Sequence, residues 1–264
     1  VGTERGAVLS LLAGSDLVLI SHHHHLQRGG IEAVRAAVQS GELSEDVIRQ
    51  AAERVLSLKA RFLSWDDQPG TSVPAWVGGE EHQQLRDQAY ELSTTLVCND
   101  EDLLPFRLEP SQRILTLSPQ LGVLSRVARG AFPQQFFVES IQQRHEQVSS
   151  ITLSPQPTDA EYQEILQAAR EADIVIAVTV NAHLDQTQAE LIQRLVQTGK
   201  RIIGIAAGNP YDLLAFPQLH TYLVTYEYTK PALAAAVRVL FGEIPSHGHL
   251  PVSLPGQYPL GHGL

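Results

Sequence analysis

The stretch Ile202-Ile203-Gly204-Ile205-Ala206 is apolar without interruption and leads directly into the turn Gly208-Asn209-Pro210-Tyr211. A second stretch of the same kind, Ile174-Val175-Ile176-Ala177-Val178, lies upstream. Strands that are apolar on both faces, instead of alternating with polar residues, are typical of parallel sheets covered by helices on both sides. These two stretches therefore predict an α/β fold built on a parallel sheet.

The segments on either side of these strands extend the alternation of strands and helices. We expect further strands at residues 94–98, 114–117, 136–139 and 222–225. Apolar residues at helical spacing predict helices over 80–93, 159–172, 186–198 and 231–241. Thr158 precedes the second of these helices and is expected to cap it.

The first 63 residues show a different order of elements. A short buried strand is expected over residues 16–20, between a helix at 4–13 and a helix pair at 31–40 and 45–61. Ser44 should cap the last helix, because Glu45 and Asp46 follow it in the first turn. A helix, a strand and a helix pair in this order are how a parallel α/β barrel ends. Residues 64–80, rich in proline and glycine, then predict a linker.

Composition excludes several classes of function. The 264 residues carry a net charge of −10 and no basic run longer than a pair, which argues against a nucleic-acid partner. No apolar run is long enough to cross a membrane. Cys98 is the only cysteine and lies in the apolar run Thr95-Leu96-Val97-Cys98, so a buried structural thiol is favoured over a reactive one.

Three short motifs follow one another in the last third of the chain. They are Gly208-Asn209-Pro210-Tyr211, Leu240-Phe241-Gly242 and Gly248-His249-Leu250-Pro251-Val252. Their order resembles the "G-x-PY", "LFG" and "GxLPV" succession of the C-terminal domain of family 3 glycoside hydrolases. Upstream, residues 13–20 and 37–59 resemble the late strand and closing helices of that family's barrel. The resemblance implies the end of a (β/α)8 barrel at 1–63, a linker at 64–80 and an α/β sandwich domain at 81–264.

The same resemblance implies which catalytic groups to look for. The family's nucleophilic Asp follows the seventh barrel strand, and no residue of this chain matches that motif. One branch, the β-glucosidases, supplies a Glu acid/base near an "E-x-x-DR" loop of the second domain, whereas the β-N-acetylhexosaminidases use a His, oriented by an Asp, in a barrel "KHFPGHG" motif. The matching loop here, Asn181-Ala182-His183-Leu184-Asp185-Gln186, has no Glu and no Asp-Arg pair. The chain is therefore most similar to the bacterial two-domain β-N-acetylhexosaminidases.

That branch implies a retaining enzyme that removes terminal β-linked N-acetylhexosamine (GlcNAc) residues. Its nucleophile and its His/Asp acid/base pair are expected upstream of Val1, so this chain alone should be inactive. The expected partners are amino-sugar glycosides or cell-wall fragments and the missing N-terminal part of the barrel. No cofactor and no metal are expected, and the compartment is left open. The alternatives are a family 3 β-glucosidase or β-xylosidase, or a non-catalytic sugar-binding module.

Four residues are candidates for contact with a substrate. His22 and His23 follow the expected last barrel strand, at the end where barrel active sites are built. The run His22-His23-His24-His25 does not predict a metal site, because an extended chain directs at most two of these side chains to one ion. His183 and Asp185 lie on a strand-to-helix loop, where α/β sheets place ligands. Asp185 is equally suited to cap the helix that begins at Gln186.

Overall fold

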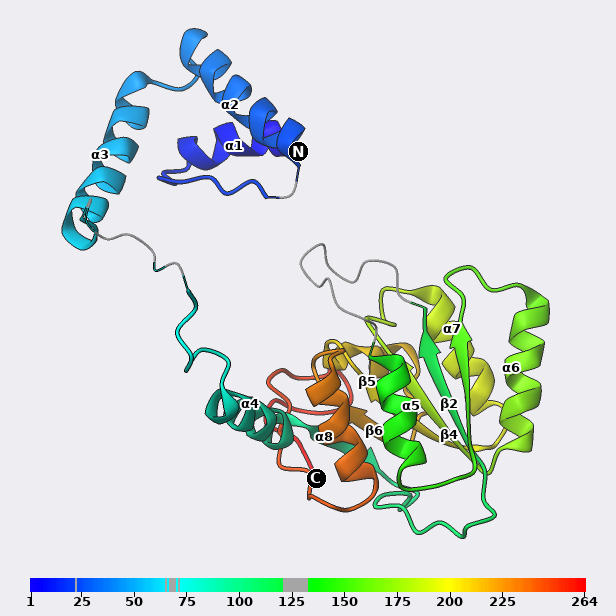
Figure 1. Cartoon of the computed structure of the whole chain (residues 1–264). Coiled ribbons are helices and arrows are strands. Elements are labelled where there is room, and N and C mark those ends of the chain that lie inside the picture. Colours follow the sequence, from blue (N-terminus) through cyan, green and yellow to red (C-terminus); the bar gives the residue numbers. More distant parts are fainter. Residues whose placement is uncertain (22, 65, 67–69, 71, 121–132) are drawn as a thin grey trace. The chain divides into compact units, whose positions relative to one another are not determined.

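The computed structural model describes residues 1–264 apart from 22, 65, 67–69, 71 and 121–132, and divides into two units, Val1–Pro74 and Ala75–Leu264. In the described part of the second unit, six strands form one sheet in the order β1-β6-β5-β4-β2-β3 (Figure 1). The strands are β1 (Thr95–Asn99), β2 (Ile114–Pro119), β3 (Val148–Leu153), β4 (Ile174–Thr179), β5 (Arg201–Ala206) and β6 (Thr221–Val224). All neighbours are parallel except β1, which pairs antiparallel with β6.

Helices cover both faces of this sheet, as the α/β prediction requires. They are α4 (Glu80–Ser93), α5 (Gln134–Gln142), α6 (Asp159–Glu171), α7 (Gln186–Val196), a short 3-10 helix η1 (Pro210–Ala215) and α8 (Lys230–Leu240). Side chains of α6 and α7 pack with Val175 and Ala177 of β4 in one core. Side chains of α5 and α8 pack with Ile174 and Ile176 in the other core. The continuous apolar strands are therefore buried on both faces.

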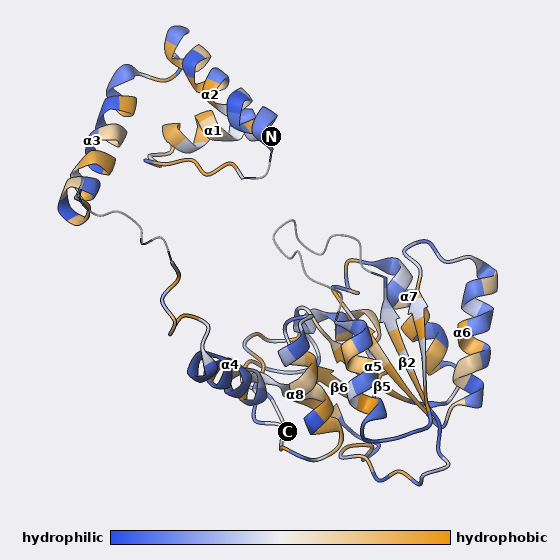
Figure 2. Ribbon diagram, in the orientation of Figure 1, coloured by the Kyte–Doolittle hydropathy of each residue, from blue (hydrophilic) through white to orange (hydrophobic). Residues whose placement is uncertain are grey.

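Hydropathy follows this layering closely. The central strands are hydrophobic along their length, and α4 is hydrophilic (Figure 2).

The predicted cap of α6 is confirmed, because Thr158 Oγ1 accepts from the amide of Glu161 at 3.2 Å and Glu161 Oε2 accepts from the amide of Thr158 at 2.7 Å. Two reciprocal bonds of this kind satisfy donors that a helix start otherwise leaves unpaired.

Two expectations for the sheet differ from the structure. Residues 136–139 belong to helix α5 and not to a strand. Phe137 and Ile141 are four residues apart and both fully buried in the α5–α8 core, so helical spacing outweighs the strand preference of these residues. The sequence analysis also missed β3, an edge strand with a largely exposed and polar surface.

Cys98 lies in β1 and is buried, with its sulfur 3.6 Å from the carbonyl oxygen of Leu219. Burial raises the pKa of the Cys98 thiol to about 11. This setting agrees with a structural thiol, because only the thiolate is a strong nucleophile.

At pH 8, iodoacetamide should alkylate Cys98 at least about 100-fold more slowly in the folded chain than in the chain unfolded in urea. The raised pKa lowers the thiolate fraction, and burial blocks access of the reagent. Mass spectrometry at timed intervals measures both rates. Equal rates in the two states would contradict the buried position of β1.

In the described residues of the first unit, three helices enclose a small core. They are α1 (Thr3–Leu12), α2 (His24–Gln39) and α3 (Glu45–Phe62). Val8, Leu11, Ala37 and Leu43 form this core. Ser44 caps α3 as expected, since its hydroxyl accepts from the amide of Val47 at 3.4 Å. No helix in the described residues is both long enough and apolar enough to span a bilayer.

The buried strand expected over residues 16–20 is wrong for this structure. The segment has no strand assignment, and the side chains of Leu17 and Leu19 are 68% and 96% exposed. A parallel strand is stabilised by neighbouring strands, and the described residues of this unit contain no other strand to pair with it. Asp16 is held instead by Arg54 of α3, whose Nη2 lies 2.7 Å from Asp16 Oδ1 and lowers the pKa of that carboxyl.

Candidate functional site

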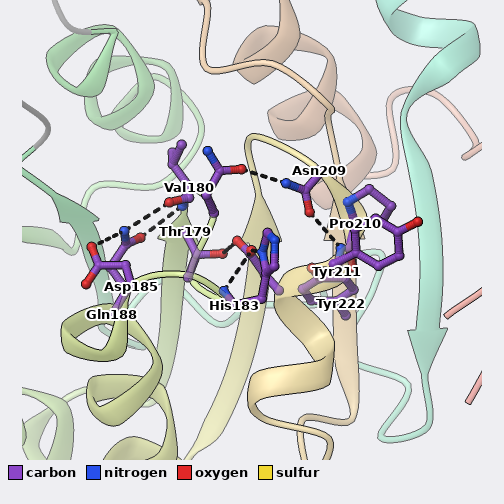
Figure 3. A network of polar contacts seen from close by, with 11 residues as sticks. Thr179, Val180, His183, Asp185, Gln188, Asn209, Pro210, Tyr211 and Tyr222 are labelled. Carbon is purple, nitrogen blue, oxygen red and sulfur yellow. Dashed lines mark hydrogen bonds and ion pairs between the residues drawn. The ribbon is translucent and has the colours of Figure 1, made fainter. Parts of the chain in front are cut away.

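The polar network in Figure 3 lies at the carboxyl ends of the adjacent parallel strands β4 and β5. The loop after β4 spans residues 180–185, and the loop after β5 leads into η1. Parallel strands that lie side by side bring their following loops to one edge of the sheet, where α/β proteins bind ligands. This edge is therefore the place to examine for functional side chains.

Asp212 is the centre of this network. Its side chain is 0% exposed, and Pro210 and Leu213 of η1 are buried with it. Asn209 starts η1 by accepting the amide of Tyr211 at 3.1 Å, and this cap places Asp212 beneath the turn. Asp212 Oδ2 accepts the hydroxyl of Thr179 at 2.8 Å. The sheet itself thus supplies a partner for the buried carboxylate.

His183 contacts the other carboxylate oxygen of Asp212, Oδ1. Its Nδ1 lies 2.9 Å from Asp212 Oδ1, and its backbone amide donates to the same atom at 3.3 Å. A carboxylate only accepts, so Nδ1 carries a proton and the ring orientation is fixed. Among the described residues, Nε2 has no hydrogen-bond partner, and the side chain is 21% exposed. A ring held in this way presents Nε2 to a ligand as a fixed polar atom.

Asp185 has a structural role in the same loop. Its Oδ1 accepts the amide of Thr187 at 3.0 Å, which caps α7 as one of the two interpretations predicts. Its Oδ2 accepts a hydrogen bond from Gln188 Nε2 at 2.8 Å. The Gln188 side chain also accepts from the amide of Val180 and donates to the carbonyl oxygen of Val180. Asp185 therefore ties the loop to the end of β4.

The two loops are joined directly by a pair of asparagines. Asn181 has a φ of 54°, in the left-handed region, and its Oδ1 accepts Asn209 Nδ2 at 2.7 Å. Tyr222 of β6 donates its hydroxyl to the carbonyl oxygen of Pro210 at 3.2 Å, and burial raises the pKa of this phenol well above its ordinary value. These contacts hold the loop after β4 against η1.

The sequence-derived candidates fall in both units of the chain. His22 lies outside the described residues. His23 precedes α2, with its ring centroid 5.4 Å from that of His25. His24 and His25 are the first two residues of α2. The assumption that the histidine run is an extended chain is therefore wrong for these two residues.

The sequence analysis missed Asp212 as the partner of His183. It identified the turn Gly208-Asn209-Pro210-Tyr211 without the residue that follows it, and Asp212 is 29 positions after His183, so no local pattern joins the two. The available signal was the pair of loops after two continuous apolar strands, because neighbouring parallel strands end at one edge.

Comparison with known proteins places this geometry in context. The family model of the glycosyl hydrolase family 3 C-terminal domain matches residues 94–259. A fungal multi-domain family 3 β-N-acetylglucosaminidase is similar over 98% of this chain and 29% of its own, with 37% identity and a TM-score of 0.79. A family 3 β-N-acetylglucosaminidase from Paenibacillus sp. str. FPU-7 is similar over 95% of this chain and 47% of its own, with 30% identity and a TM-score of 0.76.

A curated relative carries a different activity in its name. The β-xylosidase of Formosa agariphila is 21% identical over an alignment of 296 residues in length. The alignment covers 98% of this chain and 40% of the relative. This chain thus spans less than half the length of each of the three proteins.

Proposed function

Because this chain belongs to glycoside hydrolase family 3 and contains its C-terminal domain, we propose that it forms part of a longer β-N-acetylhexosaminidase of the bacterial two-domain type. The proposed reaction removes terminal β-linked GlcNAc residues from amino-sugar glycosides or cell-wall fragments with retention of configuration. A retaining glycosidase attacks the anomeric carbon with one group while a second group protonates the leaving oxygen.

The loop after β4 carries the proposal. The β-glucosidase branch supplies a Glu acid/base near an "E-x-x-DR" loop, but residues 181–186 contain no Glu and no Asp-Arg pair, and their titratable side chains are His183 and Asp185. Asp185 is engaged in the cap of α7, and His183 is held by Asp212. The 37% and 30% identities to two β-N-acetylglucosaminidases support the same substrate class.

The catalytic groups of the proposed enzyme lie upstream of Val1. Residues 1–63 would complete the (β/α)8 barrel, 64–80 would link the domains and 81–264 would form the second domain. The exposed apolar side chains of Leu17, Val18 and Leu19 support this arrangement, because in a complete barrel they would be buried in its interior and against its outer helices. His22 and His23 would then line the sugar pocket of the barrel. His183 is a separate candidate for contact with a substrate, through Nε2.

The alternative substrate class is that of a β-xylosidase or β-glucosidase. The Formosa agariphila relative favours it by name, at 21% identity. An accessory module that binds sugar without cleaving it is a further alternative. The two enzyme classes differ in which glycoside they cleave, whereas the accessory module would cleave none.

An assay with aryl glycosides tests the proposal. The 264-residue chain and a longer protein that contains it are each incubated with aryl β-GlcNAc, aryl β-glucoside and aryl β-xyloside. We expect no release of chromophore from the chain alone and release from the acetylated substrate by the longer protein. Preference for glucoside or xyloside would assign the alternative class, and activity in the chain alone would overturn the placement of the catalytic groups.

A further inference from the structure

An open cavity of about 610 Å³ lies within the second unit, and no residue of the network of His183 and Asp212 lines it. Three separate segments line it: the end of α4, the loop between β6 and α8, and the C-terminal tail. Its polar and aromatic side chains include Tyr90, Tyr226, Glu227, His247 and His249. A volume of this size is typical of a pocket for a small ligand.

Tyr226 adopts a conformation that a tyrosine rarely takes. Its φ is 62°, in the left-handed region where bulky residues are strained. Several contacts hold it there: its hydroxyl lies 2.8 Å from Thr95 Oγ1, and the preceding Thr225 donates to the carbonyl oxygen of Glu227 at 3.1 Å. Strain that neighbouring contacts maintain is concentrated at functional sites, and here it places an aromatic ring on the cavity wall.

Glu227 presents an oriented carboxylate to the same cavity. Tyr90 donates its hydroxyl to Glu227 Oε2, and Thr229 donates to that atom at 3.3 Å. Within the described part of the chain, Oε1 has no hydrogen-bond partner. The carboxylate is thus fixed on one side and remains able to accept from a ligand on the other.

The tail packs closely against the C-terminal end of α4. The amide of Gly248 donates to the carbonyl oxygen of Thr94 at 3.0 Å, and a Cβ at Gly248 would lie 2.2 Å from the carbonyl oxygen of Ser93. Only glycine allows the tail to approach so closely. His249 Nδ1 lies 3.0 Å from the carbonyl oxygen of Gly248, so it donates, and Nε2 is left as an acceptor.

The lining selects a class of ligand. It contains no lysine and no arginine among the described residues, so it offers no permanent cation to pair with a phosphate or a uronic acid. Tyrosine rings suit the apolar face of a pyranose, while a carboxylate and imidazoles accept hydrogen bonds from hydroxyl groups. We propose that this cavity is a carbohydrate-binding site, which takes a neutral pyranoside and uses no residue of the network of His183 and Asp212. The inference goes beyond the proposed reaction and does not require GlcNAc specificity.

Ligand-observed NMR and calorimetry on the 264-residue chain test the site. The probes are methyl β-glucoside, methyl β-GlcNAc and methyl β-xyloside, with glucuronic acid as the charged comparison. We expect saturable millimolar binding of at least one neutral glycoside, and weaker binding of glucuronic acid because Glu227 repels its carboxylate. Absence of saturable binding for all three neutral glycosides up to tens of millimolar would overturn the proposal.

Variants locate the binding. Tyr226→Ala and Glu227→Gln should each weaken it at least about tenfold, because they remove the ring and the charged acceptor. Glu164→Gln, on the exposed face of α6, is the control and should leave affinity unchanged. Tyr226→Phe keeps the ring and serves if the alanine variant unfolds; it should retain binding. If His183→Ala abolishes binding while Glu227→Gln does not, the sugar occupies the other site and the inference fails.

Discussion

Asp212→Ala should lower the free energy of unfolding by about 3 kcal/mol. The carboxylate is fully buried and accepts from the Thr179 hydroxyl and from two nitrogens of His183. Alanine would leave these donors without a partner, and Thr179 is itself buried. An unsatisfied buried donor costs its full desolvation energy, which exceeds the net value of a hydrogen bond.

Urea unfolding followed by circular dichroism measures this loss. Glu164→Ala on the exposed face of α6 is the control and should change stability by less than about 0.5 kcal/mol. Asp212→Asn, which keeps one acceptor oxygen, should lose less than the alanine variant. Nitrogen-15 NMR should also show that His183 loses its fixed Nδ1-protonated tautomer in Asp212→Ala. A variant as stable as the parent chain would contradict the buried network.

Gly248→Ala should lower the free energy of unfolding by a comparable amount, about 3 kcal/mol. The added Cβ would lie 2.2 Å from the carbonyl oxygen of Ser93 and 2.3 Å from Thr95 Oγ1. The first neighbour is backbone, so a side-chain rotation cannot relieve the clash. The tail would have to move away and break the bond between the Gly248 amide and the Thr94 carbonyl.

Gly79→Ala is the matched control for this substitution. A Cβ at Gly79 meets its nearest neighbour at 3.4 Å, which is an ordinary contact, so the loss should stay within about 1 kcal/mol. Because Gly248 lines the cavity, its alanine variant should also lose binding of a neutral glycoside even where it remains folded. Equal unfolding midpoints for the two variants would show that the tail packs differently.

Local patterns in the sequence were enough to predict most elements of the second unit. The continuous apolar stretches became β4 and β5, and the helices over 159–172 and 186–198 match α6 and α7 closely. These elements bury large apolar surfaces in a periodic way, so spacing alone identifies them. The caps by Thr158 and Ser44 were predictable too, because capping depends on residues three positions apart.

The errors fall where distant partners decide the local structure. Residues 136–139 contain strand-forming side chains, but packing of Phe137 and Ile141 on α8 requires a helix. Residues 16–20 have the composition of a buried strand, yet a strand forms only beside other strands. The edge strand β3 buries too little to leave an apolar pattern.

Sequence patterns alone were enough to predict the α/β class, the family resemblance and the loop that holds His183 and Asp185. The orientation of His183 by Asp212 is visible only in the folded chain, because the contact joins loops that follow two different strands. The same holds for the cavity of Tyr90, Tyr226 and Glu227, whose lining comes from three segments far apart in the chain. Periodicity and capping are local properties of a chain, whereas a site depends on which strand ends the sheet places side by side.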